Sequence, residues 1–209
     1  MTVVPRWGDG RRLRIGLLGG SFNPAHSGHR QVAELALRRL GLDQVWLLVS
    51  PGNPLKPRAG MAPIERRLRS AAAIADGRRV VATDIERVIH TRYTIDTLRT
   101  LVRRFPRARF VWLMGADGLD GLPHWRRWRE IAALMPIAVL PRPSYNHRAL
   151  AGRAAHALSR ARRPAREAGV LAERDAPAWS FLPTPQTDIS ATALRNAAHN
   201  TWPADAGSR

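Results

Sequence analysis

Short runs of apolar residues alternate along the chain with segments in which apolar residues recur at helical spacing. The runs favour buried strands, and they cover residues 13–18, 44–50, 79–83, 109–114, 137–140 and 179–182. The helical spacing predicts helices over residues 28–40, 64–75, 94–105, 125–134 and 190–198. Strands that are apolar throughout and alternate with helices are typical of a parallel sheet covered on both faces. We therefore predict an α/β fold, a doubly wound parallel sheet.

Two segments interrupt this alternation. Residues 51–63 contain four prolines and are predicted to form a loop. Residues 142–178 are rich in Arg and Ala with little apolar spacing, which favours a solvated helical excursion; a phosphate-binding arm is the alternative. The predicted organisation is a loose N-terminal tail over residues 1–12, a domain over 13–198 with a small C-terminal helical lobe, and a polar tail over 199–209.

The charge is strongly basic. Lys and Arg together number 34 against 16 Asp and Glu, which gives a net charge of +18. Lys56 is the sole lysine, and the arginines are spread along the whole chain. This pattern indicates a compositional bias toward Arg rather than a nucleic-acid interface, and its positive field would favour anionic small molecules. We predict no nucleic-acid partner.

The composition also bears on location. Cysteine is absent, which excludes disulfides, thiolate metal sites and a Cys nucleophile, and fits a reducing compartment. The longest apolar run, residues 131–140, is ten residues long, contains Pro136 and is too short to span a bilayer. The N-terminus lacks the apolar segment of a secretory signal. We expect a cytoplasmic protein with no membrane partner.

The first chemical motif is GGSFNPAHSGH, residues 19–29, between the first predicted strand and the first predicted helix. The two glycines allow close backbone approach to a ligand, and a helix start offers free N–H groups to phosphate. His26 and His29 are three residues apart, so they point the same way. The glycine spacing fits neither the dinucleotide fingerprint nor the P-loop, and no third zinc ligand is near. The motif predicts a phosphate site.

The second motif is ISATALR, residues 189–195. Ser190 and Thr192 fall at a predicted helix start, and Arg195 lies about one turn further on, where it could meet the same anion. Taken alone, the segment fits a capped C-terminal helix equally well.

Together, H-x-G-H after the first strand and I-S-A-T-x-x-R near the end resemble the nucleotidylyltransferase superfamily, which has a Rossmann-like fold. The longer first motif is similar to the nicotinate mononucleotide adenylyltransferase family within it. Four further segments agree in order, and the resemblance covers about residues 13–198; the segments are 51–57, 92–98, 115–117 with Trp125, and 141–143.

The resemblance implies transfer of the adenylyl group of ATP to nicotinate mononucleotide, a step of NAD biosynthesis that yields nicotinic acid adenine dinucleotide and pyrophosphate. The mononucleotide's phosphate is the nucleophile, so the enzyme supplies positioning and charge stabilisation. Mg²⁺ would be held mainly by ATP phosphates, with no protein ligand named. The expected partners are ATP and nicotinate mononucleotide, and no oligomeric state is indicated.

The resemblance also implies residue roles. His29, His26 and Arg195 would be catalytic, with His29 stabilising the transition state. Residues expected to bind ATP are Gly19, Gly20, Ser21, Phe22, His26, His29, Gly115, Asp117, Ser190, Thr192 and Arg195. Residues expected to bind the mononucleotide are Asn53, Lys56, Thr94 and Trp125, whose indole would stack on the pyridine ring.

Alternatives remain open at this point. The acceptor could be nicotinamide mononucleotide or phosphopantetheine, and the choice between acid and amide depends on a few contacts that sequence hides. A basic nucleic-acid-binding protein is a more distant alternative. Two departures from the family pattern matter: Asn23 stands where members often have Asp, and the chain ends fourteen residues after Arg195, where relatives often continue with another helix.

Overall fold

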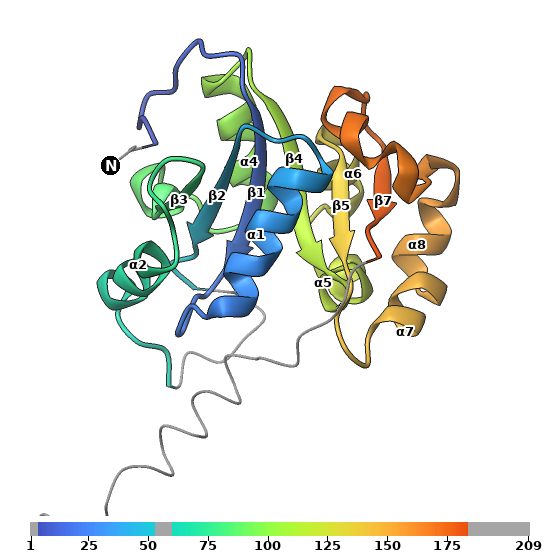
Figure 1. The fold of residues 1–209 in the computed structure, drawn as a ribbon, viewed down its shortest axis with the longest axis horizontal. Helices are drawn as coiled ribbons and strands as arrows, with labels where there is room; N and C mark the ends of the chain where they lie inside the picture. The colour runs from blue at the N-terminus through green and yellow to red at the C-terminus, as the bar shows by residue number, and fades with distance from the viewer. Residues whose placement is uncertain (1–3, 53–59, 184–209) are drawn as a thin grey trace, which may run out of the picture.

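The computed structural model describes residues 4–52 and 60–183 (Figure 1). Within these residues, one seven-stranded sheet has the order β3-β2-β1-β4-β5-β7-β6, and every pair of neighbouring strands is parallel. The strands are β1 (Arg14–Gly20), β2 (Gln44–Val49), β3 (Val80–Thr83), β4 (Arg109–Gly115), β5 (Ile137–Leu140), β6 (Arg162–Arg163) and β7 (Trp179–Phe181). The chain builds outward from β1 to β3 and then returns to place β4 beside β1, so the strand order reverses between β1 and β4.

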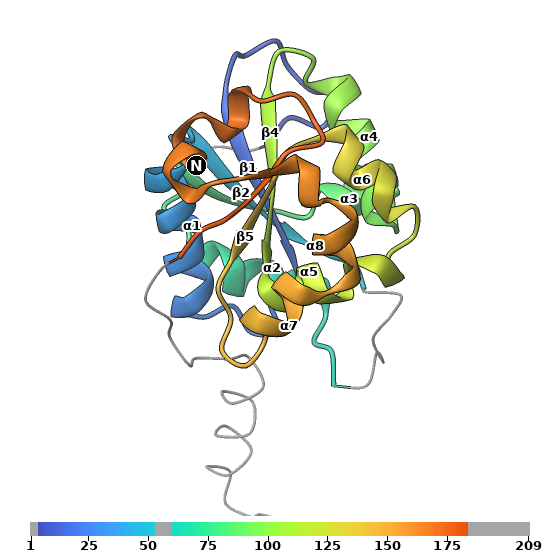
Figure 2. The same ribbon diagram turned by 90° about the vertical axis from the view of Figure 1, so that its right-hand side faces the viewer.

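Helices cover both faces of the sheet (Figure 2). One face packs against α1 (Ser27–Arg39), α2 (Ile64–Ala73) and the 3-10 segment η3 (Ala165–Glu173). The opposite face packs against a second set: α3 (Ile85–Val88), α4 (Thr94–Arg104), α5 (Ala116–Gly121), α6 (Trp128–Leu134), α7 (Asn146–Ala151) and α8 (Arg153–Ala157). The predicted α/β, doubly wound, Rossmann-like parallel sheet is confirmed.

The continuous apolar strands follow from this two-sided cover. In β1, Leu17 faces one core and its neighbour Leu18 faces the other. In β2, Trp46 and Leu47 divide in the same way. A strand buried on both faces needs an apolar residue at every position, which is the pattern that made these strands predictable.

One predicted helix is wrong in its start. The segment 125–134 is helical only from Trp128, because the preceding residues form the 3-10 turn η1 (Leu122–His124), an extended Trp125 and a left-handed Arg127 with φ 54°. The left-handed residue breaks the helical path, and apolar spacing carries no signal for it. The short helices α3 and α5 were not predicted. The predicted helix 190–198 lies outside the described residues.

Residues 142–178 are largely helical with many exposed side chains, as expected, but the segment also packs against the rest of the fold, which the sequence did not indicate. Its alanines are the buried contact points, including Ala149 of α7, Ala154 of α8 and Ala168 of η3. Between η2 (Ser159–Ala161) and η3, the chain adds β6 to the sheet through pairing with β7. Alanine provides little apolar signal in sequence, but it lets backbones pack closely.

The N-terminal segment contacts the rest of the fold at several points from residue 4 onward, although much of it is exposed. Val4 is buried, and the Arg104 guanidinium donates to the carbonyl oxygen of Arg6. Gly8 has φ 86°, and a Cβ there would lie 1.8 Å from the Arg104 carbonyl oxygen. Among the described residues, no helix is both long and apolar enough to cross a bilayer.

Candidate active site

The carboxyl ends of the central strands bring the first motif and the end of β4 together. In Figure 1 these ends lie at the bottom of the view, beside the start of α1 and beside α5. Strand β1 pairs with β4 on one side and with β2 on the other, so the segments after Gly20, Ser50 and Gly115 leave the same edge of the sheet. In α/β sheets, ligands bind at this edge where the strand order reverses.

The Gly-rich segment is shaped by a tryptophan beneath it. A Cβ on Gly19 would lie 2.7 Å from Cη2 of Trp112, so only glycine fits there without displacing the indole. Phe22 has a left-handed backbone with φ 48° and is buried. Its ring centroid lies 4.9 Å from that of His29. The turn therefore folds its one large side chain inward, next to a histidine of the motif.

His26 and His29 stand together at the start of α1, with ring centroids 3.9 Å apart. The backbone N–H of His26 donates to Nδ1 of His29 at 3.2 Å. Because Nδ1 accepts this bond, the neutral His29 ring carries its proton on Nε2 and can donate it to a ligand. Burial, the neighbouring His26 and Arg142 lower the pKa of His29 to about 3.

His26 is buried, and burial followed by the charge of Arg142 lowers its pKa as well. Its Nδ1 has no hydrogen-bond partner within the described part of the chain. The nearby His29 amide N–H donates instead to the His26 carbonyl oxygen at 2.9 Å. A buried polar atom without a partner is costly, and a ligand could provide the missing bond. Because the pKa values of both histidines are lowered from 6.5, both imidazoles are neutral at neutral pH.

Arg142 belongs to this site, although the sequence analysis assigned it no role. It is the second residue after β5, and its charge is a cause of the lowered pKa of both histidines. Its Nε lies 3.7 Å from Oδ1 of Asp117, and both side chains are partly exposed. A Cβ on Gly115 would lie 2.4 Å from the same Asp117 oxygen. The position of Arg142 just after a buried strand is the sequence signal that could have identified it.

The expected acceptor side is formed by the start of α4 and by Trp125. Trp125 packs edge-on against Trp112 with ring centroids 6.2 Å apart, and Trp112 in turn contacts Gly19. Thr94 is the first residue of α4. Its neighbour Tyr93 lies beneath the Arg126 guanidinium, 4.6 Å from ring centroid to Cζ. The chain neighbours of Thr94 and Trp125 are thus in contact with each other.

The side chain of Asn23 makes two hydrogen bonds to the backbone, and a carboxylate could make only one of them. Its Nδ2 donates to the carbonyl oxygen of Gly60 at 2.9 Å, and its Oδ1 accepts from the Ala62 N–H at 3.2 Å. An Asp here would lose the donor. Five expected site residues lie outside the described ranges: Asn53, Lys56, Ser190, Thr192 and Arg195.

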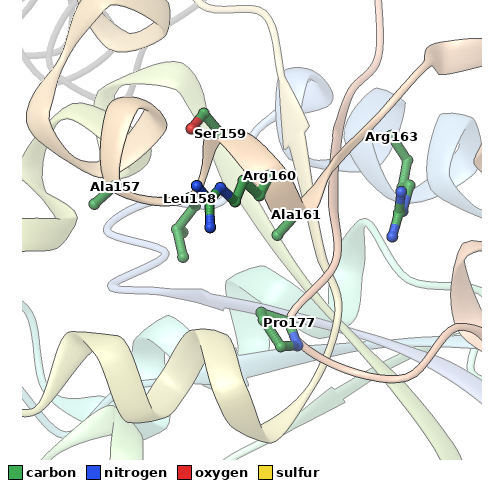
Figure 3. A pocket seen from close by; sticks show the side chains of 7 residues that line it. All are labelled: Ala157, Leu158, Ser159, Arg160, Ala161, Arg163 and Pro177. Atoms are coloured by element: carbon green, nitrogen blue, oxygen red, sulfur yellow. The ribbon is translucent and has the colours of Figure 1, made fainter.

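A surface depression of about 420 Å³ lies elsewhere, beside the amino ends of the edge strands β6 and β7 (Figure 3). Its lining includes Leu158, Arg160, Arg163 and Pro177. It is formed by none of the residues described above and is not part of this site.

Residues 17–197 match the family model described as cytidylyltransferase-like, and the sheet order and the histidine pair after β1 agree with a nucleotidyltransferase. A probable nicotinate-nucleotide adenylyltransferase of Gluconacetobacter diazotrophicus is 64% identical over 198 residues, which cover 95% of this chain and 92% of the relative. A protein of the same description from Gluconobacter oxydans is 64% identical over 88% of this chain and 95% of its own length. The chain belongs to the nicotinate-nucleotide adenylyltransferase family.

Solved structures agree on the fold. Plasmodium falciparum nicotinic acid mononucleotide adenylyltransferase complexed with NaAD matches with a TM-score of 0.66 at 16% sequence identity. The match covers 88% of this chain and 82% of that one.

Proposed function

We propose that this protein transfers the adenylyl group of ATP to nicotinate mononucleotide, giving nicotinic acid adenine dinucleotide and pyrophosphate, as a step of NAD biosynthesis. The observation that carries this is 64% identity to a probable nicotinate-nucleotide adenylyltransferase across 92% of that relative. Neutral histidine donors beside a Gly-rich turn support the same chemistry.

In the proposed reaction, the 5′-phosphate of the mononucleotide attacks the α-phosphorus of ATP. A new P–O bond forms, the bond between the α-phosphorus and its bridging oxygen breaks, and pyrophosphate leaves. The attacking phosphate is already anionic, so no protein nucleophile is needed. The protein's contribution is to hold the two reactants in line and to stabilise charge on the α-phosphoryl oxygens.

His29 is the residue we assign to that charge. Its Nδ1 is occupied by the His26 N–H, which leaves Nε2–H as the donor. A donor that is already oriented needs no rearrangement as charge develops. His26 would supply a second donor, and the backbone of Gly19, Gly20, Ser21 and Phe22 would line the phosphate path.

The remaining ATP contacts follow from position. Gly115 and Asp117 would meet the adenosine, with Asp117 accepting hydrogen bonds from ribose hydroxyls. Arg142, which lies beside Asp117 and the histidines, supplies a positive charge on the same side. Ser190, Thr192 and Arg195 would hold the β- and γ-phosphates.

On the acceptor side, Thr94 and Trp125 would hold the nicotinate, while Asn53 and Lys56 would line its phosphate. Helix α6 begins at Trp128 and not at Trp125, so no helix start lies at Trp125 to offer N–H groups to the carboxylate. The preference for the acid over the amide therefore rests on the relatives and not on that helix.

We also propose that Mg²⁺ enters with ATP, held by phosphate oxygens and water. In residues 4–52 and 60–183, no three His, Cys, Asp or Glu side chains come together to bind a metal. Binding through the nucleotide requires no such group, since Mg²⁺ commonly keeps several waters when it binds with phosphates. The cytoplasm, as a compartment with ATP, is the proposed location, with neither nucleic acid nor membrane as a partner.

The test is pyrophosphate release from ATP and Mg²⁺ with nicotinate mononucleotide, nicotinamide mononucleotide or phosphopantetheine as the acceptor, with the dinucleotide product identified by chromatography. We expect the highest kcat/KM with nicotinate mononucleotide. A higher kcat/KM with either of the other acceptors would overturn the proposed substrate, and no transfer to any of them would overturn the proposed reaction.

A further inference from the structure

Two buried charged side chains play no part in the proposed chemistry. They are Arg67 on α2 and Glu86 on α3, which are 3% and 8% exposed. Ionised side chains are rarely buried this deeply unless they are paired or hydrogen-bonded. Each of the two therefore needs a structural or functional reason.

Arg67 ties three backbone segments together. Its Nη1 donates to the carbonyl oxygens of Ser21 at 2.9 Å and Ser50 at 2.7 Å, and its Nε donates to that of Ala62 at 2.8 Å. Ser21 belongs to the Gly-rich turn after β1, and Ser50 directly follows β2. One guanidinium thus fixes the phosphate turn against the end of the neighbouring strand.

Glu86 reaches the same serine from the other side. Its carboxyl group accepts from Oγ1 of Thr97 at 3.3 Å, and hydrogen bonding from the side chains of Thr97 and Ser50 partly offsets the effect of burial on its pKa. Thr97 is on the first turns of α4, and its Oγ1 also lies 2.8 Å from Oγ1 of Thr91. The carboxyl group therefore connects the end of β2 with the helix that begins at Thr94.

Ser50 is the point where the two systems meet. Its carbonyl oxygen accepts from Arg67, and its side chain bonds to Glu86 and accepts from the Gly52 N–H at 3.2 Å. A continuous polar path thus runs from the phosphate turn to the start of α4. The ends of this path are the two places to which the proposed function assigns the two substrates.

We propose that Glu86 is a positioning residue for the mononucleotide, because it holds the start of α4 against the end of β2 through Thr97 and Ser50. The inference rests on the proposed function, which puts the mononucleotide at Thr94. Arg67 bonds to the carbonyl oxygens of both Ser50 and Ser21. The start of α4 is therefore held in a fixed position relative to the turn that would bind the ATP phosphates. A displacement of the acceptor by about 1 Å can cost as much as ~10²-fold in rate, which is why such a link matters.

The carboxyl group suits this place in both of its forms. Burial raises the pKa of Glu86 to about 7, so near neutral pH the protonated form is substantially present. A protonated carboxyl group can donate one hydrogen bond and accept others, which allows it to serve two hydroxyl groups at once. Glutamine has nearly the same shape, and its amide, like the protonated carboxyl group, offers both a donor and an acceptor.

The experiment compares Glu86→Ala, Glu86→Gln and Val88→Ala in the full-length enzyme. Val88 is a partly buried residue of the same short helix and controls for a general loosening of α3. For Glu86→Ala we expect the KM for nicotinate mononucleotide to rise about 5- to 30-fold, as for the loss of one or two buried hydrogen bonds, with the KM for ATP within about twofold. Glu86→Gln should restore the mononucleotide KM to within about twofold of wild type, because it keeps those bonds.

An equal rise in both KM values, or the same selective rise in Val88→Ala, would overturn the assignment and leave Glu86 a general packing residue. If Glu86→Ala does not fold, Thr97→Val removes the hydroxyl partner in nearly the same volume and should give the same selective rise. A wild-type enzyme that does not use nicotinate mononucleotide would refute the proposed function instead. The same comparison would then be made with the mononucleotide it does use.

Discussion

At the scale of single residues, His29 shows how one hydrogen bond decides what a side chain can do. The His26 N–H occupies Nδ1, and a pKa lowered to about 3 keeps the ring neutral, so the free Nε2–H is a donor at neutral pH. We predict that His29→Ala lowers kcat by ~10²–10³, the typical loss for one oriented donor to a developing charge. Binding of nicotinate mononucleotide should remain, which calorimetry would measure.

The matched control is His156→Ala, because His156 is an exposed residue of α8. It should leave kcat unchanged. A His29→Ala enzyme within a few-fold of wild-type turnover would remove His29 from the transition state.

Protonation of Glu86 and of His29 makes the folding stability depend on pH. The pKa of Glu86 is raised from 4.5 to about 7, so between these values the folded state holds a proton that the unfolded state has lost, and stability falls as pH rises. The pKa of His29 is lowered from 6.5 to about 3, so there the unfolded state holds the extra proton and stability rises with pH. Between pH 4.5 and 6.5 the two slopes oppose each other.

We therefore predict that Glu86→Gln changes the pH profile and not just the level of stability. From pH 5 to 7, the unfolding free energy of the variant should rise relative to wild type by about 1 kcal/mol per pH unit, and it should level off above pH 7. Urea unfolding at several pH values would measure this. A difference that stays constant with pH would mean that Glu86 does not titrate in this range.

Sequence alone pointed to the residues of this candidate site that lie in contiguous motifs, such as His26, His29 and Asp117. It did not identify Arg142, Arg67 or Glu86. Their roles depend on which segments meet at the edge of the sheet. They also depend on burial, which cannot be predicted for a charged residue because such residues are usually exposed. For Glu86, the partners Ser50 and Thr97 are on different elements.

At the scale of elements, patterns with strong physical causes were the ones that could be predicted. Strands buried on two faces are apolar at every position, and six of the seven strands were found this way. The seventh, β6, consists of two exposed arginines and has no such signal. The alanine contacts of α7 and α8 and the left-handed turn at Arg127 were also hidden, because neither produces apolar periodicity.

The close approach of Gly19 in β1 to Trp112 in β4 leads to a prediction about the stability of the central strands. A Cβ on Gly19 would lie 2.7 Å from Cη2 of an indole that is itself buried. Gly19→Ala should therefore destabilise the fold by about 1–3 kcal/mol, as in overpacked cores. Gly121→Ala is the control, since a Cβ there meets nothing within 4 Å.

Replacing Trp112 tests whether its indole is the reason that position 19 requires glycine. Trp112→Phe removes the ring that reaches Gly19, so the cost of Gly19→Ala should be smaller in the Trp112→Phe background. The measurement is a double-mutant cycle by urea unfolding. Strictly additive effects would show that this contact is not what requires glycine.

The segment between η1 and α6 carries a prediction about the acceptor. If Trp125 stacks on the pyridine ring, Trp125→Ala should raise KM for the acid and amide mononucleotides by similar factors, because stacking does not detect the carboxylate. Trp7→Ala is the control, since Trp7 is 75% exposed and lies in the N-terminal segment. An unchanged KM in Trp125→Ala would remove this residue from the site.

At the scale of the whole molecule, fold class and family could be predicted because the apolar runs alternate clearly with helical spacing and the first motif follows the first run. The strand order could not be, since apolar runs do not indicate which strands are neighbours. The position of the motifs nevertheless agrees with the observed order, because the first motif leaves β1 at the reversal beside β4. That reversal is where sheets of this kind bind ligands.

The net charge of +18 leads to the last prediction. Several arginines are tied up in ion pairs at distant places, such as Arg14 with Asp43 on one side of the sheet and Arg148 with Asp120 on the other. Scattered charge attracts DNA through counterion release alone, a term that is independent of sequence and falls steeply with salt. We expect weak duplex binding at low ionic strength that disappears by ~150 mM salt, where charges more than about 8 Å apart are screened. Fluorescence anisotropy with two unrelated duplexes across a salt series measures this, and tight binding that distinguishes the duplexes at ~150 mM salt would instead indicate a nucleic-acid interface. Because the same field acts on small anions, added salt should also raise the KM of both phosphorylated substrates, and it should do so without a selective effect on either one.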